Sequence, residues 1–284
     1  MLTKNNWLKN NIKDRVKIEN RLLPLEVILT PDTITSNSFN SAVDTVLKYL
    51  LTLDQEIYLA FSGGIDSDYI FYKLVEWDIP FTPLICYFEG NKIEYQYALH
   101  TCKKFDITPQ FFNLSEKDYL KYFIDEVKPW GGGGLYSVPN LLLGKYAKEK
   151  GAKLLTGQDF ITGSHDHCSM GFNVYDFYAD IDDDSIEIPF FLYNTDIVYH
   201  AVKNFNPNIS VGEWKYKLFE IVDFRPKIEF HNLGFESWQF LKQYYAQIHN
   251  HYNNDGIDVV NKDKFLAALE NTGEEIILNA NYTY

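Results

Sequence analysis

The chain has 284 residues, enough to bury a sizeable core, and its hydrophobic fraction of 46% is that of a folded globular protein. No apolar run approaches the ~20 residues that a membrane span needs, and Met1 to Asn6 lacks the apolar stretch of a secretory signal, so neither a membrane protein nor a secreted one is expected. The formal net charge of −13 argues against general nucleic-acid binding, which depends on Lys and Arg to displace counterions from phosphates.

The three cysteines, Cys86, Cys102 and Cys168, are scattered and have no CxxC spacing. A disulfide framework is therefore not expected, and a reducing cytoplasm is the expected compartment.

Expected strands and helices alternate along the middle of the chain. A strand at 25–29 and a helix at 40–51 come first, and four strands then alternate with helices: 57–61, helix 67–77, 82–88, helix 94–105, 110–114, helices 117–127 and 139–150, and 153–156. This alternation predicts an α/β fold, a Rossmann-like parallel sheet with right-handed crossovers, whose strand order is not readable from the sequence.

Beyond residue 165 the regularity fades, and helices are expected near 195–204, 210–221, 235–250 and 262–271. We therefore divide the chain into an N-terminal segment (1–39), an α/β core (40–165) and a mainly helical C-terminal extension packed on the core (166–284).

The loop Ser62–Ser67 (SGGIDS) joins a short apolar strand directly to the start of a helix. Gly63 and Gly64 let the backbone approach an anion closely, and the helix N-terminus adds partial positive charge. Ser62 and Ser67 can donate hydroxyl hydrogen bonds, whereas Asp66 would repel naked phosphate and is expected to hold a Mg²⁺ that bridges phosphate oxygens. The loop predicts a pyrophosphate site, and it differs from the GxxxxGK[ST] phosphate loop because it contains no lysine.

This motif resembles that of the N-type ATP pyrophosphatases, which include asparagine synthetase, NAD synthetase and GMP synthetase. Three further stretches, 87–98, 136–143 and 153–159, are similar to the synthetase domain of asparagine synthetase. The resemblance covers roughly residues 40–165. It implies an adenine nucleotide alpha hydrolase-like fold, and ATP and Mg²⁺ as the bound cofactors.

Carried over residue by residue, the resemblance implies two groups of nucleotide-binding residues. The pyrophosphate and its magnesium would contact Ser62, Gly63, Gly64, Asp66 and Ser67. The adenosine side of the site would be formed by Ala60, Tyr87, Gly157 and Gln158. All of these lie at or just beyond the carboxyl ends of expected strands, where open parallel sheets bind ligands.

The sequence departs from asparagine synthetase in two places. The second residue is Leu2 rather than part of a glutaminase domain that begins with a catalytic cysteine, so an amine or ammonia donor is expected to come from elsewhere. Gln158 also replaces a glutamate associated with amide formation, and a glutamine cannot take up a proton as a carboxylate can. Asp159 is the candidate to compensate, as a metal ligand or a base.

A cation for the departing pyrophosphate must come from outside the loop, because negative charge accumulates on that group during the reaction. The densest basic patch in the C-terminal half spans 212–227, and Lys215 or Lys217 is the candidate catalytic cation. The alternative is an ordinary amphipathic helix whose lysines lie in water.

The expected function is an ATP-dependent ligase that forms AMP and pyrophosphate. It would adenylate a carboxylate or carbonyl oxygen of a small molecule for attack by a nitrogen nucleophile, and a homodimer is compatible with the sequence. Two alternatives stay open: an enzyme of the same superfamily that modifies a nucleobase or tRNA, which the 21 Tyr and 21 Phe residues favour, and a nucleotide-binding protein that has lost its chemistry.

Overall fold

The computed structural model describes residues 7–10, 26–88, 91–122, 125, 137–157, 162–164, 167–171, 187–206, 208–220, 256–259 and 262–279. No helix within these ranges is both long and apolar enough to cross a membrane.

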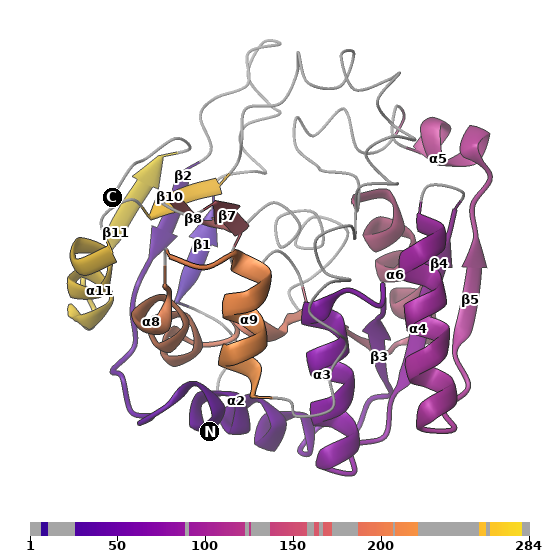
Figure 1. Ribbon diagram of the computed structural model, residues 1–284, viewed down its shortest axis with the longest axis horizontal. Coiled ribbons are helices and arrows are strands. Elements are labelled where there is room, and N and C mark those ends of the chain that lie inside the picture. The colour runs from indigo at the N-terminus through magenta and orange to yellow at the C-terminus, as the bar shows by residue number, and fades with distance from the viewer. Residues whose placement is uncertain are drawn as a thin grey trace.

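The fold contains a five-stranded parallel sheet, and three of its strands are labelled in Figure 1. Its strands lie in the order β5 (Gln110–Asn113), β4 (Thr82–Tyr87), β3 (Ile57–Ala60), β6 (Lys153–Thr156) and β9 (Glu187–Pro189). All neighbouring pairs are parallel, which confirms the predicted α/β Rossmann-like sheet. The chain starts in the middle at β3, runs to the edge strand β5, and then crosses back to β6, so the strand order reverses between β3 and β6. Ligands of doubly wound sheets bind at this switch point, beyond the carboxyl ends of the strands.

Helices cover both faces of the sheet. Their bounds are α2 (Phe39–Leu50), α3 (Ile65–Glu76), α4 (Lys92–Lys104), α5 (Glu116–Tyr122), α6 (Ser137–Lys150), α8 (Thr195–Asn204), α9 (Val211–Phe219) and α11 (Lys262–Glu270), with a 3₁₀ turn η4 (Phe190–Leu192). The predicted helix at 235–250 lies outside the described residues.

Alternating side chains of the central strands divide the core into two layers, because successive strand residues point to opposite faces. In β3, Leu59 packs into the larger cluster, which includes residues of α2, α3, α8 and α9. Tyr58 belongs to a smaller cluster with Leu143 and Ala147 of α6. Both faces of the sheet are thus buried, and this accounts for the near-continuous apolar runs in the sequence.

The region beyond residue 165 contributes strands as well as helices. β9 pairs with β6 and completes the parallel sheet, although it lies outside the expected core of residues 40–165. It was not predicted because a strand of three residues is too short to give a periodic signal. Two small antiparallel sheets add β7 (Thr162–Ser164), β8 (His167–Gly171) and β10 (Gly256–Val259), and separately β1 (Leu8–Asn10), β2 (Glu26–Leu29) and β11 (Ile276–Asn279). The second of these sheets joins the N-terminal segment to the C-terminal region of the chain.

Candidate nucleotide site

The glycine loop between β3 and α3 is pressed against α4. Gly63 has φ +80°, a conformation that L side chains rarely adopt. A Cβ atom there would lie 2.6 Å from both the Ala98 nitrogen and the Glu94 carbonyl oxygen. A glycine is therefore required on two counts, backbone conformation and space, and the loop approaches the α4 backbone more closely than any other residue would allow.

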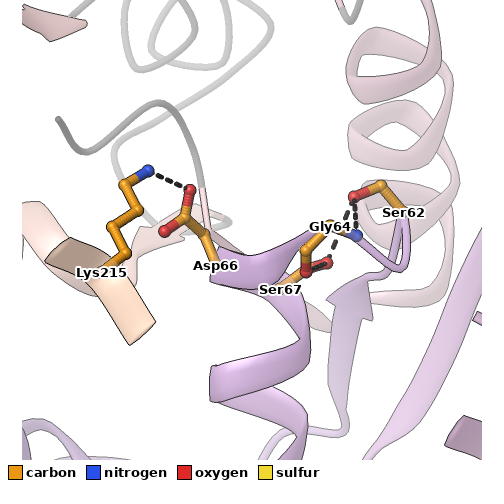
Figure 2. Close-up of polar contacts among 5 residues, drawn as sticks. All are labelled: Ser62, Gly64, Asp66, Ser67 and Lys215. Carbon is orange, nitrogen blue, oxygen red and sulfur yellow. Dashed lines mark hydrogen bonds and ion pairs between the residues drawn. The ribbon is translucent and has the colours of Figure 1, made fainter. Parts of the chain in front are cut away.

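Two serine hydroxyls shape the loop from within (Figure 2). The Ser62 Oγ accepts a hydrogen bond from the Gly64 N–H at 3.1 Å and lies 3.2 Å from the Ser67 Oγ. The Ser67 hydroxyl donates to the Gly64 carbonyl oxygen at 3.1 Å. The Gly64 amide, which was expected to face an anion, is thus bonded to Ser62 here.

Gly64 is also the N-cap of α3, and it has no side chain with which to accept hydrogen bonds from the first turn. The first N–H groups of a helix have no intrahelical partner and face outward with the positive end of the helix dipole. An anion at the start of α3 would meet these first-turn amides.

Gly157 brings the end of β6 against the same turn of α3. A Cβ atom on Gly157 would lie 2.8 Å from Ile70 Cδ1 and 3.1 Å from the Ser67 nitrogen. The glycine therefore lets β6 and α3 approach each other at the switch point of the sheet. The family resemblance implied that Gly157 contacts adenosine, and this stays a prediction.

Asp66 meets a cation from a distant part of the chain. Its Oδ2 lies 2.6 Å from Lys215 Nζ, and the two side chains are only 15% and 6% exposed, respectively. Lys215 comes from α9, which packs on α3 (Figure 2). The structure thus places a buried ammonium beside the loop, which contains no lysine of its own.

Lys217, the other candidate, is not brought to the loop. Its side chain is 57% exposed and forms an ion pair with Glu213, one turn earlier in α9, at 3.4 Å. Two residues advance roughly 200° around a helix, so Lys215 and Lys217 cannot face the same neighbour. The alternative, that the lysines of this helix lie in water, is correct for Lys217 and wrong for Lys215.

The residues expected around adenosine lie at neighbouring strand ends. Ala60 is the last residue of β3 and Tyr87 the last of β4, where the Tyr87 ring contacts Tyr95 with centroids 4.7 Å apart. Gln158 and Asp159 lie outside the described residues.

Sequence reasoning missed Asp68, the second acidic residue in the first turn of α3. It is 2% exposed and accepts a hydrogen bond from Thr101 Oγ1 of α4 at 2.9 Å. Since residues i and i+2 of a helix face different sides, Asp66 points toward α9 while Asp68 ties the turn to α4. Two acidic residues in the first turn of α3 could have been noticed in the sequence. Only the packing shows that Asp66 faces α9 and that Asp68 binds α4.

No protein-family model matches the sequence, and no curated protein matches it. Among solved structures, the chain is similar to NMN synthetase from Francisella tularensis, with 14% identity and a TM-score of 0.31 over 76% of this chain and 92% of that one. It is also similar to the NH3-dependent NAD synthetase from Campylobacter jejuni, with 15% identity and a TM-score of 0.34 over 81% and 94% of the two chains.

A third similar structure is the glutamine-dependent NAD+ synthetase from Acinetobacter baumannii in complex with ADP, with 12% identity and a TM-score of 0.35. The match covers 81% of this chain but 43% of that longer one. These likenesses are too distant to assign a family. None of the three is an asparagine synthetase, so these comparisons do not support the closer resemblance to that enzyme that the sequence motifs led us to expect.

Proposed function

We propose that this protein binds Mg-ATP at the Ser62–Ser67 loop and splits it into AMP and pyrophosphate to activate a substrate. The observation that carries the proposal is the contact between Asp66 and Lys215 at the start of α3. It joins a carboxylate, suited to a phosphate-bound magnesium, to an ammonium, suited to phosphate oxygens, beside a glycine loop at the switch point of a parallel sheet.

The residues present fit a magnesium ion held jointly with ATP. Within the described ranges, no group of three or more His, Cys, Asp or Glu side chains could hold a metal by itself. Magnesium is commonly bound by one or two carboxylates together with substrate phosphates, so the single carboxylate of Asp66 is the expected protein ligand. When bound there, the ion would neutralise part of the charge on the phosphates.

Lys215 is proposed to stabilise the departing pyrophosphate. A substrate oxygen forms a bond to the α-phosphorus while the bond from that phosphorus to the bridging oxygen breaks, and the electron pair leaves with pyrophosphate. The ammonium of Lys215 is buried beside the loop, and a fixed charge in a site shielded from water would act strongly on the charge that develops on a pyrophosphate bound there. Because Lys215 is already paired with Asp66, it stands within reach of whatever that carboxylate binds.

For a carboxylate substrate the second step completes an amide, and at an adenylated carbonyl oxygen nitrogen would replace AMP in the same way. A nitrogen nucleophile attacks the adenylated carboxyl carbon, AMP leaves with the bonding electron pair, and the nucleophile loses a proton. This asparagine synthetase-like reaction is supported by the sequence motifs at 87–98, 136–143 and 153–159, and the acceptor is proposed only as a small molecule with a carboxylate or carbonyl oxygen.

Incubating the protein with Mg-ATP and pooled metabolites, and separately with nucleic acid, tests the proposal. AMP and pyrophosphate should appear in equal amounts, and Asp66→Asn should abolish their formation. Production of ADP and phosphate would reject the mechanism. Turnover that depends on nucleic acid would instead indicate a nucleobase-modifying enzyme, and nucleotide binding without pyrophosphate release would indicate a protein that has lost the chemistry.

A further inference from the structure

Two pairs of side chains join α3 to α9. Asp66 and Lys215 form the first pair. Tyr69 lies three residues after Asp66 in α3, and Phe219 lies four residues after Lys215 in α9, so each helix presents its two residues on one face. The rings of Tyr69 and Phe219 stack with centroids 4.2 Å apart and an interplanar angle of 23°. Because both pairs advance in the same direction, α9 runs parallel to α3 along this contact (Figure 1).

The second pair, Tyr69 and Phe219, is part of a buried aromatic cluster. Phe219 also stacks on Phe191 at 5.6 Å and 9° and on Phe39 at 5.9 Å and 27°. Tyr69 stacks on Phe191 at 5.8 Å. All four side chains are 4% exposed or less. Since protein interiors are as dense as molecular crystals, α9 cannot slide along α3 without repacking these rings.

Polar contacts tie the end of α9 to the same place. The Tyr69 hydroxyl donates to Asn40 Oδ1 at 3.4 Å, and Asn40 Nδ2 donates to Glu220 Oε2 at 3.0 Å. Glu220 is the C-cap of α9 and has a left-handed backbone with φ 50°. The helix that carries Lys215 is therefore held at its C-terminal end by α3 and by the start of α2.

We propose that Phe219 is a positioning residue for Lys215. The stacking of its ring on Tyr69 fixes the position of α9 along the axis of α3, and this holds the Lys215 ammonium at Asp66. The catalytic part of this inference rests on the proposed function, because it assumes that Lys215 acts on the departing pyrophosphate. A displacement of about 1 Å at a catalytic group can cost roughly a hundredfold in rate, so removing the ring should impair turnover although Phe219 itself is buried in the core.

Amine labelling tests the positioning without any enzyme assay. The native protein is treated with a limiting amount of acetic anhydride, and the ratio of labelling at Lys215 to labelling at Lys217 is measured by mass spectrometry. Lys217 is an internal reference on the same helix, because its side chain is 57% exposed whereas that of Lys215 is 6% exposed. Phe219→Leu and Phe219→Ala should raise this ratio several-fold.

Phe265→Ala is the matched control, since it removes an equally buried ring from α11 and should leave the ratio unchanged. Phe219→Leu retains most of the side-chain volume, so it gives a result even if Phe219→Ala does not fold. A ratio in Phe219→Leu equal to that of the unmodified protein would overturn the inference.

A kinetic cycle tests the catalytic part. Phe219→Leu should lower kcat roughly tenfold to a hundredfold with a smaller change in the KM for ATP, because the loop itself is unaltered. In a Lys215→Met background the same substitution should have little further effect on kcat. An equal loss in both backgrounds would mean that Phe219 does not act through Lys215. If the unaltered protein forms no AMP and pyrophosphate, the proposed function fails, and the labelling ratio still decides whether Phe219 holds Lys215.

Discussion

Asp66 and Lys215 are separated by 149 residues in the sequence, yet their side chains meet at 2.6 Å, largely shielded from solvent. The pair connects the first turn of the helix after the glycine loop to a helix from the C-terminal part of the chain. Because a charge is costly to bury alone, each residue depends on the other to stay in place.

Breaking this pair from either side should destabilise the protein. Asp66→Asn leaves the Lys215 ammonium buried beside a neutral amide, so we expect the free energy of unfolding to fall by about 1–3 kcal/mol. Adding Lys215→Met should recover part of the loss, because no unpaired charge remains. Urea unfolding of the two single variants and the double variant measures this coupling. Strictly additive losses would contradict the pairing.

Lys215 and Lys217 offer a matched test of catalysis on one helix. Lys215→Met should lower kcat for pyrophosphate formation by about 10²–10³-fold, the usual cost of removing one group that stabilises transition-state charge. Lys217→Met should leave kcat near its original value, because its exposed ion pair with Glu213 lies away from the loop. Steady-state assays of AMP release compare the two. Similar losses in both variants would show that α9 contributes through its general charge.

Gly63 and Gly273 provide a comparison between two glycines with almost the same backbone conformation. Gly63 has φ +80° and Gly273 has φ +81°, but a Cβ on Gly273 would meet nothing within 4 Å. Gly273→Ala should therefore cost only the left-handed strain of about 1–2 kcal/mol. Gly63→Ala should cost about 1–3 kcal/mol more, because its methyl group would overlap the backbone of α4. Denaturant midpoints of the two variants measure the difference, and equal midpoints would refute the close approach.

The stability of the protein should fall at alkaline pH. Burial raises the pKa of the Cys86 thiol to about 12 from an ordinary value of 9.0, and burial also raises the pKa of Tyr69. Below pH 9 these groups are neutral in both states, and their contribution to stability is fully present. As the pH rises from about 9 toward 12, the unfolded chain releases protons that the folded chain retains, so the free energy of unfolding decreases.

Urea midpoints measured from neutral pH to a pH of about 10.5 test this expectation. Cys86→Ala should show a smaller decrease over the same range, since one of the buried acids is gone. A midpoint that stays constant or increases with pH would contradict the direction of these shifts.

The sequence determined the local features of this protein. The apolar runs and helical periodicity located the strands and helices of the core, with β6 at 153–156 as predicted and α3 beginning two residues earlier than expected because Gly64 serves as its N-cap. Glycines and hydroxyls after an apolar strand also marked the loop. These features depend on residues that are close together in the chain, so they can be predicted from a single sequence.

Only the tertiary structure decided the strand order, the fifth strand and which of the two lysines, Lys215 or Lys217, meets Asp66. β9 has three residues, and it is a strand because β6 supplies its partner. The period of α9 shows that the two lysines face different sides, but not which side meets α3. That choice follows from burying Phe219 against Tyr69, a contact across 150 residues whose free energy comes from removing aromatic surface from water.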